Sequence, residues 1–201
     1  MSSSDSPVTE SRPRRIVRRA IGPKLRKVFY ILLFLVALLG ANSIYLVSIT
    51  LYDWLSGETL ENWFYQYMFL AHLILRLLLL APFILFGVVH IYNTKNRLNR
   101  RAVRVGFALF ITSCLLLISG ILLLRIGSFD LKNPTARSIT YWCHVLSPVF
   151  ALWLYWLHRL VGPKIHWKAG LSYLGVITAM VVGMLMFHSA DPRKWNVVGP
   201  A

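Results

Sequence analysis

Charged residues are scarce in this chain, and acidic residues are the scarcest. Only 14% of the 201 residues are Asp, Glu, Lys or Arg, whereas a soluble domain carries about 25%. Just 7 residues are acidic, while 57% are hydrophobic. This balance excludes a soluble globular protein. Because apolar segments take up most of the length, they leave no room for a soluble catalytic domain or a nucleotide-binding βαβ unit.

Cysteine is also rare, with 2 residues in the chain. Cys114 and Cys143 each lie alone within an apolar segment, which excludes a secreted disulfide scaffold. The Cys-x-x-Cys-His motif, which attaches haem covalently, is missing from the sequence. We therefore expect both thiols to pack inside helices.

Long uncharged runs are present instead. Four segments of 20 or more residues are almost free of charge, near 28–52, 62–92, 105–124 and 138–158, and a fifth runs from about 169 to 188. A helix needs about 20 apolar residues to span a bilayer. We therefore predict an all-α integral membrane protein with five transmembrane helices. The first run is too long for the core of a signal peptide, so we expect it to stay in the mature protein.

The basic residues set the predicted orientation. The formal net charge is +15, and most of the 22 Lys and Arg residues precede the first segment or lie in the second–third and fourth–fifth connections. The positive-inside rule then places the N-terminus in the cytoplasm and the C-terminus in the periplasm of a bacterial cytoplasmic membrane. Because the basic stretch borders a membrane segment, we assign it to topology and to anionic membrane lipid rather than to nucleic acid. Five of the seven acids belong to the opposite side: Asp53, Glu58, Glu61, Asp130 and Asp191.

Three regions follow from this pattern. Residues 1–27 form a basic cytoplasmic segment, residues 28–190 form the membrane domain, and residues 191–201 form an outer tail. The tail begins with a short basic and aromatic stretch, residues 191–195, which favours docking of an acidic partner. A solvated tail with an interfacial tryptophan is the alternative.

Histidine is the commonest ionisable residue inside the predicted helices, where such residues are costly and mark functional sites. His72 and His90 lie 18 residues apart in the second segment, and His144 and His158 lie 14 residues apart in the fourth. Eighteen residues make about five helical turns, and fourteen fall about 40° short of four, so each pair faces one direction. If the two helices are antiparallel and face each other, His90 meets His158 near the cytoplasmic ends, and His72 meets His144 towards the outer side.

Two facing imidazoles at each of two depths fit two bis-histidine haem sites. Haem iron takes axial imidazoles, and the macrocycle replaces apolar packing in the bundle core. A zinc or copper site would need three or four donors at one depth, which this spacing does not offer. A single membrane histidine more often packs or hydrogen-bonds, and the pattern of four outweighs that role here. His188 is assigned to the interface, with a role as outer ligand in place of His72 as the alternative.

The pattern resembles the N-terminal, haem-bearing half of cytochrome b from the cytochrome bc complexes, in which the second and fourth helices each supply two histidines. Gly106 and Gly120 in the third segment are also 14 residues apart, and that family uses glycines at this spacing to let each porphyrin approach the backbone. Gly40 in the first segment is a single candidate for the same role. The resemblance covers about residues 28–190.

The resemblance implies a four-helix bundle that binds two non-covalent haem b groups, with a fifth helix beside it. It implies that the axial ligands of the two haem irons are His72, His90, His144 and His158.

The chain departs from the family pattern in the second segment. The His72–His90 spacing is 18, and the position where a spacing of 14 would place a ligand is Arg76. Pro82, between the two histidines, removes a backbone donor and kinks or loosens the helix, which shifts the depth of the ligand. Arg76 is then a candidate partner for an outer haem propionate, with a snorkelling or water-cavity arginine as the alternative.

These features predict a membrane dihaem cytochrome b that moves electrons between the quinone pool and a partner protein, as a subunit of a quinone or quinol oxidoreductase complex. The expected partner on the outer face is a periplasmic multihaem cytochrome c or another redox subunit. Two other classes stay open, a haem-free membrane transporter whose histidines relay protons and a structural membrane anchor.

Overall fold

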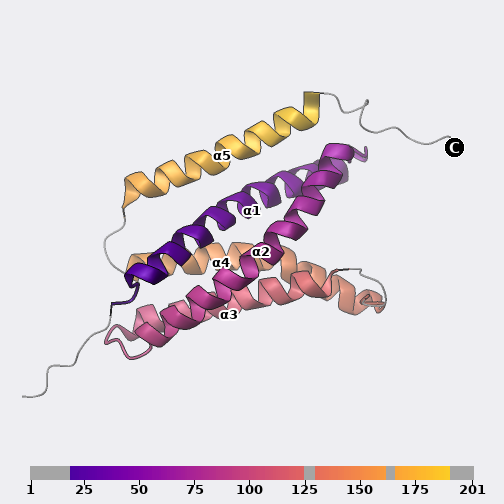
Figure 1. Ribbon diagram of the computed structural model, residues 1–201. Helices are drawn as coiled ribbons and strands as arrows, with labels where there is room; N and C mark the ends of the chain where they lie inside the picture. Colours follow the sequence, from indigo (N-terminus) through magenta and orange to yellow (C-terminus); the bar gives the residue numbers. More distant parts are fainter. Residues whose placement is uncertain (1–18, 125–129, 162–165, 191–201) are drawn as a thin grey trace, which may run out of the picture.

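The computed structural model describes residues 19–124, 130–161 and 166–190. These residues form five α-helices in chain order: α1 (Pro23–Ser56), α2 (Trp63–Thr94), α3 (Arg100–Leu122), α4 (Pro134–Val161) and α5 (Trp167–Ala190). Successive helices run back and forth between two ends of the molecule (Figure 1). The predicted all-α fold is confirmed, with one helix over each of the five apolar segments.

Of the described helices, α1, α2, α3 and α5 are long and apolar enough to span a membrane. Helix α4 covers the predicted segment 138–158 and has 28 residues. Its Trp, Tyr, His and Ser residues lower its mean hydropathy, so it is not among the four. Its exposed side chains are nevertheless apolar, since Val149, Leu152 and Trp153 are 66%, 71% and 57% exposed. Such a surface is suited to surrounding hydrocarbon.

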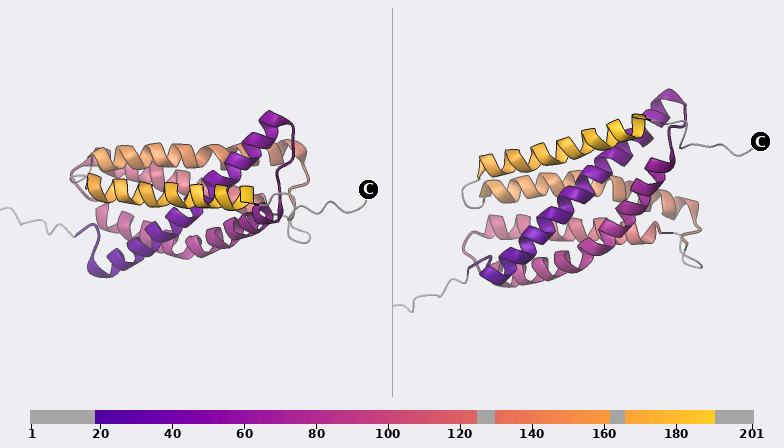
Figure 2. Two further views of the ribbon diagram at one scale, coloured as in Figure 1. Left: turned by 90° about the horizontal axis from the view of Figure 1, so that it is seen from above. Right: turned by 45° about the horizontal axis from the view of Figure 1, so that its top comes forward.

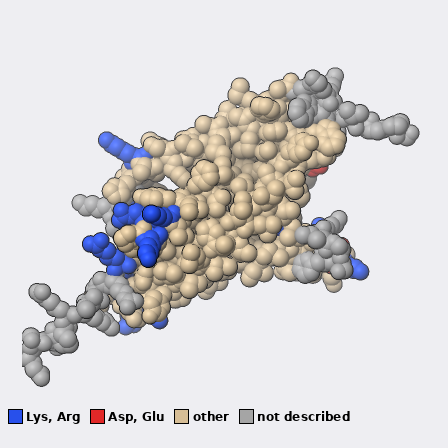
Figure 3. All heavy atoms as spheres, viewed as in Figure 1, with Lys and Arg blue, Asp and Glu red and all other residues tan. Residues whose placement is uncertain are grey.

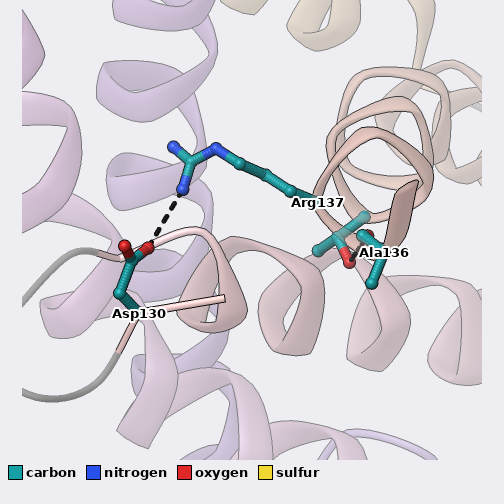
Figure 4. A network of polar contacts seen from close by, with 4 residues as sticks. Asp130, Ala136 and Arg137 are labelled. Carbon is teal, nitrogen blue, oxygen red and sulfur yellow. Dashed lines mark hydrogen bonds and ion pairs between the residues drawn. The ribbon is translucent and has the colours of Figure 1, made fainter. Parts of the chain in front are cut away.

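Asparagine begins three of the helices. The side chains of Asn62, Asn99 and Asn133 each accept a hydrogen bond from the backbone N–H three residues further on, at 3.0, 3.1 and 3.1 Å. This is the usual N-cap, which satisfies one of the free donors of the first turn. At the start of α4, Arg137 Nη1 also forms an ion pair with Asp130 Oδ1 at 3.2 Å (Figure 4). These contacts fix the starting points of α2, α3 and α4.

The backbones of α3 and α4 pack closely along each other, and α1 packs against both α2 and α5. Smaller contacts join α2 to α3 and to α5. In the described part of the chain, α2 and α4 are not among the closely packed helix pairs. The molecule is therefore a four-helix bundle of α1–α4, with α5 lying outside it along α1 (Figures 1 and 2).

Helix α2 continues through Pro82 and bends along its length (Figures 1 and 2). A proline inside a helix removes one backbone hydrogen bond and is a usual cause of such a bend. Near the bend, Phe83 stacks on Phe110 of α3 with ring centroids 5.5 Å apart. A Cβ atom at Gly87 would lie 2.7 Å from Cδ2 of Phe110. A residue with Cβ at this position would therefore require the Phe110 ring to move.

Charge separates the two ends of the bundle. Lysine and arginine side chains gather at the end where α1, α3 and α5 begin (Figure 3). We call this the basic end. The acids Asp53, Glu58 and Glu61 lie at the opposite end, around the α1–α2 connection. Both groups fall at the ends that the sequence predicts. The basic residues of the described helices at the basic end include Lys24, Arg26, Lys27, Arg100, Arg101, Arg104 and Lys168.

Candidate functional site

Two pairs of histidines face each other between α2 and α4. The ring centroids of His72 and His144 are 6.3 Å apart, with the ring planes at 86°. Those of His90 and His158 are also 6.3 Å apart, with the planes at 78°. The second pair lies nearer the basic end, and we call it the inner pair. The outer pair, His72 and His144, lies towards the opposite end. The pairing that the spacing predicts is confirmed.

The bend in α2 explains why unequal spacings give equal separations. In a straight helix, 18 residues rise about 27 Å and 14 residues rise about 21 Å. Two straight, parallel helices therefore cannot align both pairs. A helix that is bent or inclined relative to its neighbour needs more residues to cover the same depth, and α2 crosses the bundle at an angle to α4 (Figure 1). The four additional residues between His72 and His90, about one helical turn, compensate for this inclination.

The separation within each pair suits one metal atom held from both sides. A metal–imidazole bond is about 2 Å long, and the ring centroid lies about 1 Å behind the bonded nitrogen because ring bonds are about 1.3 Å long. Two rings that share a metal atom therefore have centroids about 6 Å apart. A direct N–H···N hydrogen bond would bring the centroids to about 5 Å. The 6.3 Å found in both pairs leaves room for the first arrangement and is also the separation of an ordinary edge-to-face ring contact.

The polar contacts of the outer pair leave one nitrogen of each ring available. Ser43 Oγ lies 3.4 Å from His72 Nδ1. Ser119 Oγ lies 3.3 Å from His144 Nδ1, and the carbonyl oxygen of Leu116 lies 3.2 Å from the same atom. With Nδ1 engaged in both rings, Nε2 is the atom left for a ligand. This is the usual division of roles in a metal-bound histidine.

The inner pair carries polar atoms without a partner. Nδ1 of His90 and Nδ1 of His158 are buried, and neither has a hydrogen-bond partner among the described residues. Phe86 stacks on the ring of His90 with centroids 5.2 Å apart and planes at 11°. A buried polar nitrogen is normally paired, because leaving it unpaired costs free energy. The inner rings thus differ from those of the outer pair, in which Nδ1 contacts a serine hydroxyl.

Two of the three predicted glycines lie directly beside the histidine pairs. A Cβ atom at Gly120 would lie 2.8 Å from Cε1 of His144 and would also collide with Nη1 of Arg76. A Cβ atom at Gly106 would lie 3.2 Å from Cε1 of His158. Gly40 differs, because no described heavy atom comes within 4 Å of its Cβ position. Helix α3 thus supplies one glycine to each pair, and the role of Gly40 beside a cofactor stays a prediction.

Arg76 lies one helical turn from His72 and is buried, with 7% of its surface exposed. Its Nε and Nη2 atoms have no hydrogen-bond partner among the described residues. This burial argues against the snorkelling alternative, in which the charged group stays in water. A buried guanidinium is costly unless an anion or other acceptors satisfy it. The position next to Gly120 and His72 therefore suits a ligand with a carboxylate.

His188, near the end of α5, is buried against α1. Its side chain is buried, with 6% exposed, and its Nδ1 lies 2.8 Å from the hydroxyl of the fully buried Tyr45. Asn62 Nδ2 donates to the backbone carbonyl of His188 at 3.3 Å. His188 therefore joins the end of α5 to α1 and to the start of α2, and it contacts Tyr45 rather than either member of the outer pair.

Three residues of this region, Ser43, Tyr45 and Ser119, were not predicted. Each is polar and lies inside an apolar segment, which was the available signal. Serine in a membrane helix often bonds only its own backbone, and the sequence does not show which serine also meets a histidine of another helix.

Among the described residues, no group of three or more His, Cys, Asp or Glu side chains is arranged to hold a metal ion. Each pair offers two imidazole donors, so further donors would have to come from a bound group. The predicted docking stretch, residues 191–195, lies outside the described residues. Comparisons of the chain with protein-family models, with curated proteins and with solved structures found no match.

Proposed function

We propose that this protein is a membrane dihaem cytochrome b that passes electrons between the quinone pool and a partner protein. The observation that carries this proposal is the presence of two histidine pairs with the same 6.3 Å separation, one towards each end of the bundle. In this proposal, His72 and His144 hold the outer haem b, and His90 and His158 hold the inner one.

The residues around each pair support this choice of group. A metal bound by protein side chains alone would need more donors than the two that each pair provides. Haem needs only two axial ligands from the protein, and when bound it supplies reversible one-electron chemistry. Because Gly106 and Gly120 have no side chain, α3 can approach His158 and His144 closely. A flat macrocycle packed against a helix also requires a residue without Cβ.

Arg76 would orient the outer group. Its two unpartnered buried nitrogens, Nε and Nη2, can donate charge-assisted hydrogen bonds to a carboxylate such as a haem propionate. The same contact would satisfy the buried guanidinium. Its side chain reaches Gly120 of α3, so it lies on the His144 side of α2.

The orientation of the chain in the membrane indicates on which side each redox partner would bind. The positive-inside rule makes the basic end cytoplasmic, so the outer pair lies towards the periplasm. We propose a periplasmic multihaem cytochrome c, or another redox subunit, as the protein partner on that side. Quinone, dissolved in the membrane, is the proposed small-molecule partner.

The direct test is spectroscopic. The purified protein is reduced either with dithionite or with a quinol, and the reduced-minus-oxidised absorption spectrum is recorded. We expect low-spin b-type bands with both reductants, and the same spectrum from the His166→Ala variant, because His166 is exposed and lies outside the helices that carry the pairs. A preparation from haem-replete cells without a reducible haem would contradict the proposal and favour a haem-free transporter or anchor.

A further inference from the structure

Two serines from different helices touch the histidines of the outer pair. Ser43 belongs to α1 and Ser119 to α3, and their Oγ atoms lie 3.4 and 3.3 Å from Nδ1 of His72 and His144. Ser119 is buried, with 3% exposed. The outer pair is thus contacted from both flanking helices through the same ring atom, Nδ1.

The serine hydroxyls are oriented by their own helices. Ser43 Oγ donates its only proton to the carbonyl oxygen of Leu39 at 2.7 Å. Ser119 Oγ donates to the carbonyl oxygen of Leu116 at 3.0 Å. A hydroxyl has one donor and two acceptor sites, so each serine is left only with acceptor capacity towards the histidine. The ring nitrogen that it contacts must therefore be the donor.

A second contact supports this direction at His144. The carbonyl oxygen of Leu116 lies 3.2 Å from His144 Nδ1, and a carbonyl can only accept. His144 Nδ1 therefore carries the hydrogen, and Nε2 carries the lone pair. A metal needs that lone pair, and a neutral imidazole with the hydrogen on Nδ1 presents it at Nε2.

The inner pair lacks these contacts. Nδ1 of His90 and Nδ1 of His158 have no hydrogen-bond partner among the described residues. Backbone groups, of Ala20 and of Ala102, are the polar neighbours of these two rings. The two histidine pairs therefore share their spacing but differ in that a serine hydroxyl contacts Nδ1 of each ring only in the outer pair.

We infer that Ser43 and Ser119 are positioning residues, which hold His72 and His144 in the tautomer with Nε2 free and lower the redox potential of the outer haem. This inference rests on the proposed function. An imidazole that donates its other N–H to an acceptor is a more basic ligand. A more basic ligand stabilises ferric over ferrous iron, so the hydrogen bond lowers the potential of the site.

The test compares midpoint potentials of the complete protein by redox titration. We expect Ser43→Ala to raise the potential of the outer haem, to leave that of the inner haem unchanged, and to keep two haems. Ser119→Ala should give a smaller shift in the same direction, because the Leu116 carbonyl still accepts from His144. Ser43→Thr should restore the original potential, because threonine keeps the hydroxyl. Arg76 is unchanged in all these variants, so its charge affects every outer-haem potential equally. Differences in potential between the variants therefore come from the serines.

Two matched serines provide controls. Ser48 on α1 donates to the carbonyl oxygen of Ile44 at 2.7 Å, and Ser113 on α3 donates to that of Leu109 at 2.8 Å. Ser48→Ala and Ser113→Ala remove the same kind of helical contact, and we expect neither to move a haem potential.

Each outcome is decisive. Two haems with unchanged potentials in both Ser43→Ala and Ser119→Ala would overturn the inference while leaving the proposed function intact. A wild-type protein without haem would instead overturn the proposed function. If Ser43→Ala does not retain the outer haem, Ser119→Ala gives the same readout, and an unchanged potential there overturns the inference.

Discussion

His72 on α2 lies opposite His144 on α4, with ring centroids 6.3 Å apart and ring planes at 86°. Among the described residues, these two helices are not a closely packed pair. Their histidines nevertheless approach each other at two depths with equal separations. Two helices of a bundle that do not pack closely, and whose ionisable side chains point towards each other, are typical of a cofactor site in a helical membrane protein.

Substituting the four histidines should remove the haems one at a time. We expect His90→Ala and His158→Ala each to lose the inner haem, and His72→Ala and His144→Ala each to lose the outer haem, because each ring supplies half of an axial ligand set. Redox titration of each variant should then show one component. His188→Ala should retain both haems, because His188 contacts Tyr45 instead. Loss of a haem in His188→Ala, with two haems kept in His72→Ala, would reverse the outer assignment.

Alanine substitutions of the α3 glycines should lower the haem content in proportion to how closely other atoms approach each glycine. Gly120→Ala places a methyl group 2.8 Å from Cε1 of His144, whereas Gly106→Ala places one 3.2 Å from Cε1 of His158. We expect Gly120→Ala to lower the haem content per chain strongly, at the outer site, and Gly106→Ala to lower it less, at the inner site. Gly175→Ala on α5 is the control, because nothing described lies within 4 Å of its Cβ position. Equal haem content in all three variants would contradict this ranking.

Much of this arrangement could be predicted from sequence periodicity. Helices follow from the apolar runs, and His144 and His158 share a face because 14 residues are close to four turns. His72 was predicted on the same reasoning although its spacing is 18, and Pro82 indicated a bend that changes its depth. Gly106 and Gly120 could be predicted because they share the 14-residue spacing.

Contacts between distant helices could not be predicted in the same way. Ser43 and Ser119 look like the serines at positions 48 and 113, and only the rotation of α1 and α3 about their axes decides which pair meets a histidine. His188 was assigned to the interface from its place at the end of an apolar segment, and that place does not show that the hydroxyl of Tyr45, 143 residues away, contacts its ring. Gly40 was predicted beside a cofactor from its residue type, and the open space at its Cβ position leaves that prediction untested.

Removing the Tyr45 hydroxyl should destabilise the outer end of the protein. Tyr45→Phe leaves the buried Nδ1 of His188 unpaired, which we expect to cost about 1–3 kcal/mol. Thermal unfolding in detergent measures this loss, and haem content should stay at the wild-type level. Tyr173→Phe is the matched control on the same helix pair, because Tyr173 donates to the carbonyl oxygen of Leu33 at 2.8 Å. That carbonyl lies within α1, where it also takes part in the backbone hydrogen bonding of the helix. Losing the Tyr173 contact should therefore reduce the free energy of unfolding by less. Equal destabilisation by both variants would count against a special role for the Tyr45–His188 pair.

Removing the charge of Arg76 should lower the potential of the outer haem. A nearby positive charge favours the reduced form of a redox centre, because reduction adds one negative charge. We expect Arg76→Gln to shift the outer midpoint potential downward and to leave the inner one in place, since Arg76 lies beside Gly120 and His72. Arg76→Lys should shift it less. A shift in the midpoint potential of the inner haem alone would contradict the assignment of Arg76 to the outer haem.

The number of haems per chain tests the central claim most directly. Pyridine haemochrome analysis of the purified protein, set against its protein concentration, should give close to two haem b per chain. The double variant His90→Ala with His72→Ala should give none, because it removes one ligand from each pair. A well-loaded wild-type preparation without haem b would contradict the account, and a value of one would show that only one of the two histidine pairs holds a haem.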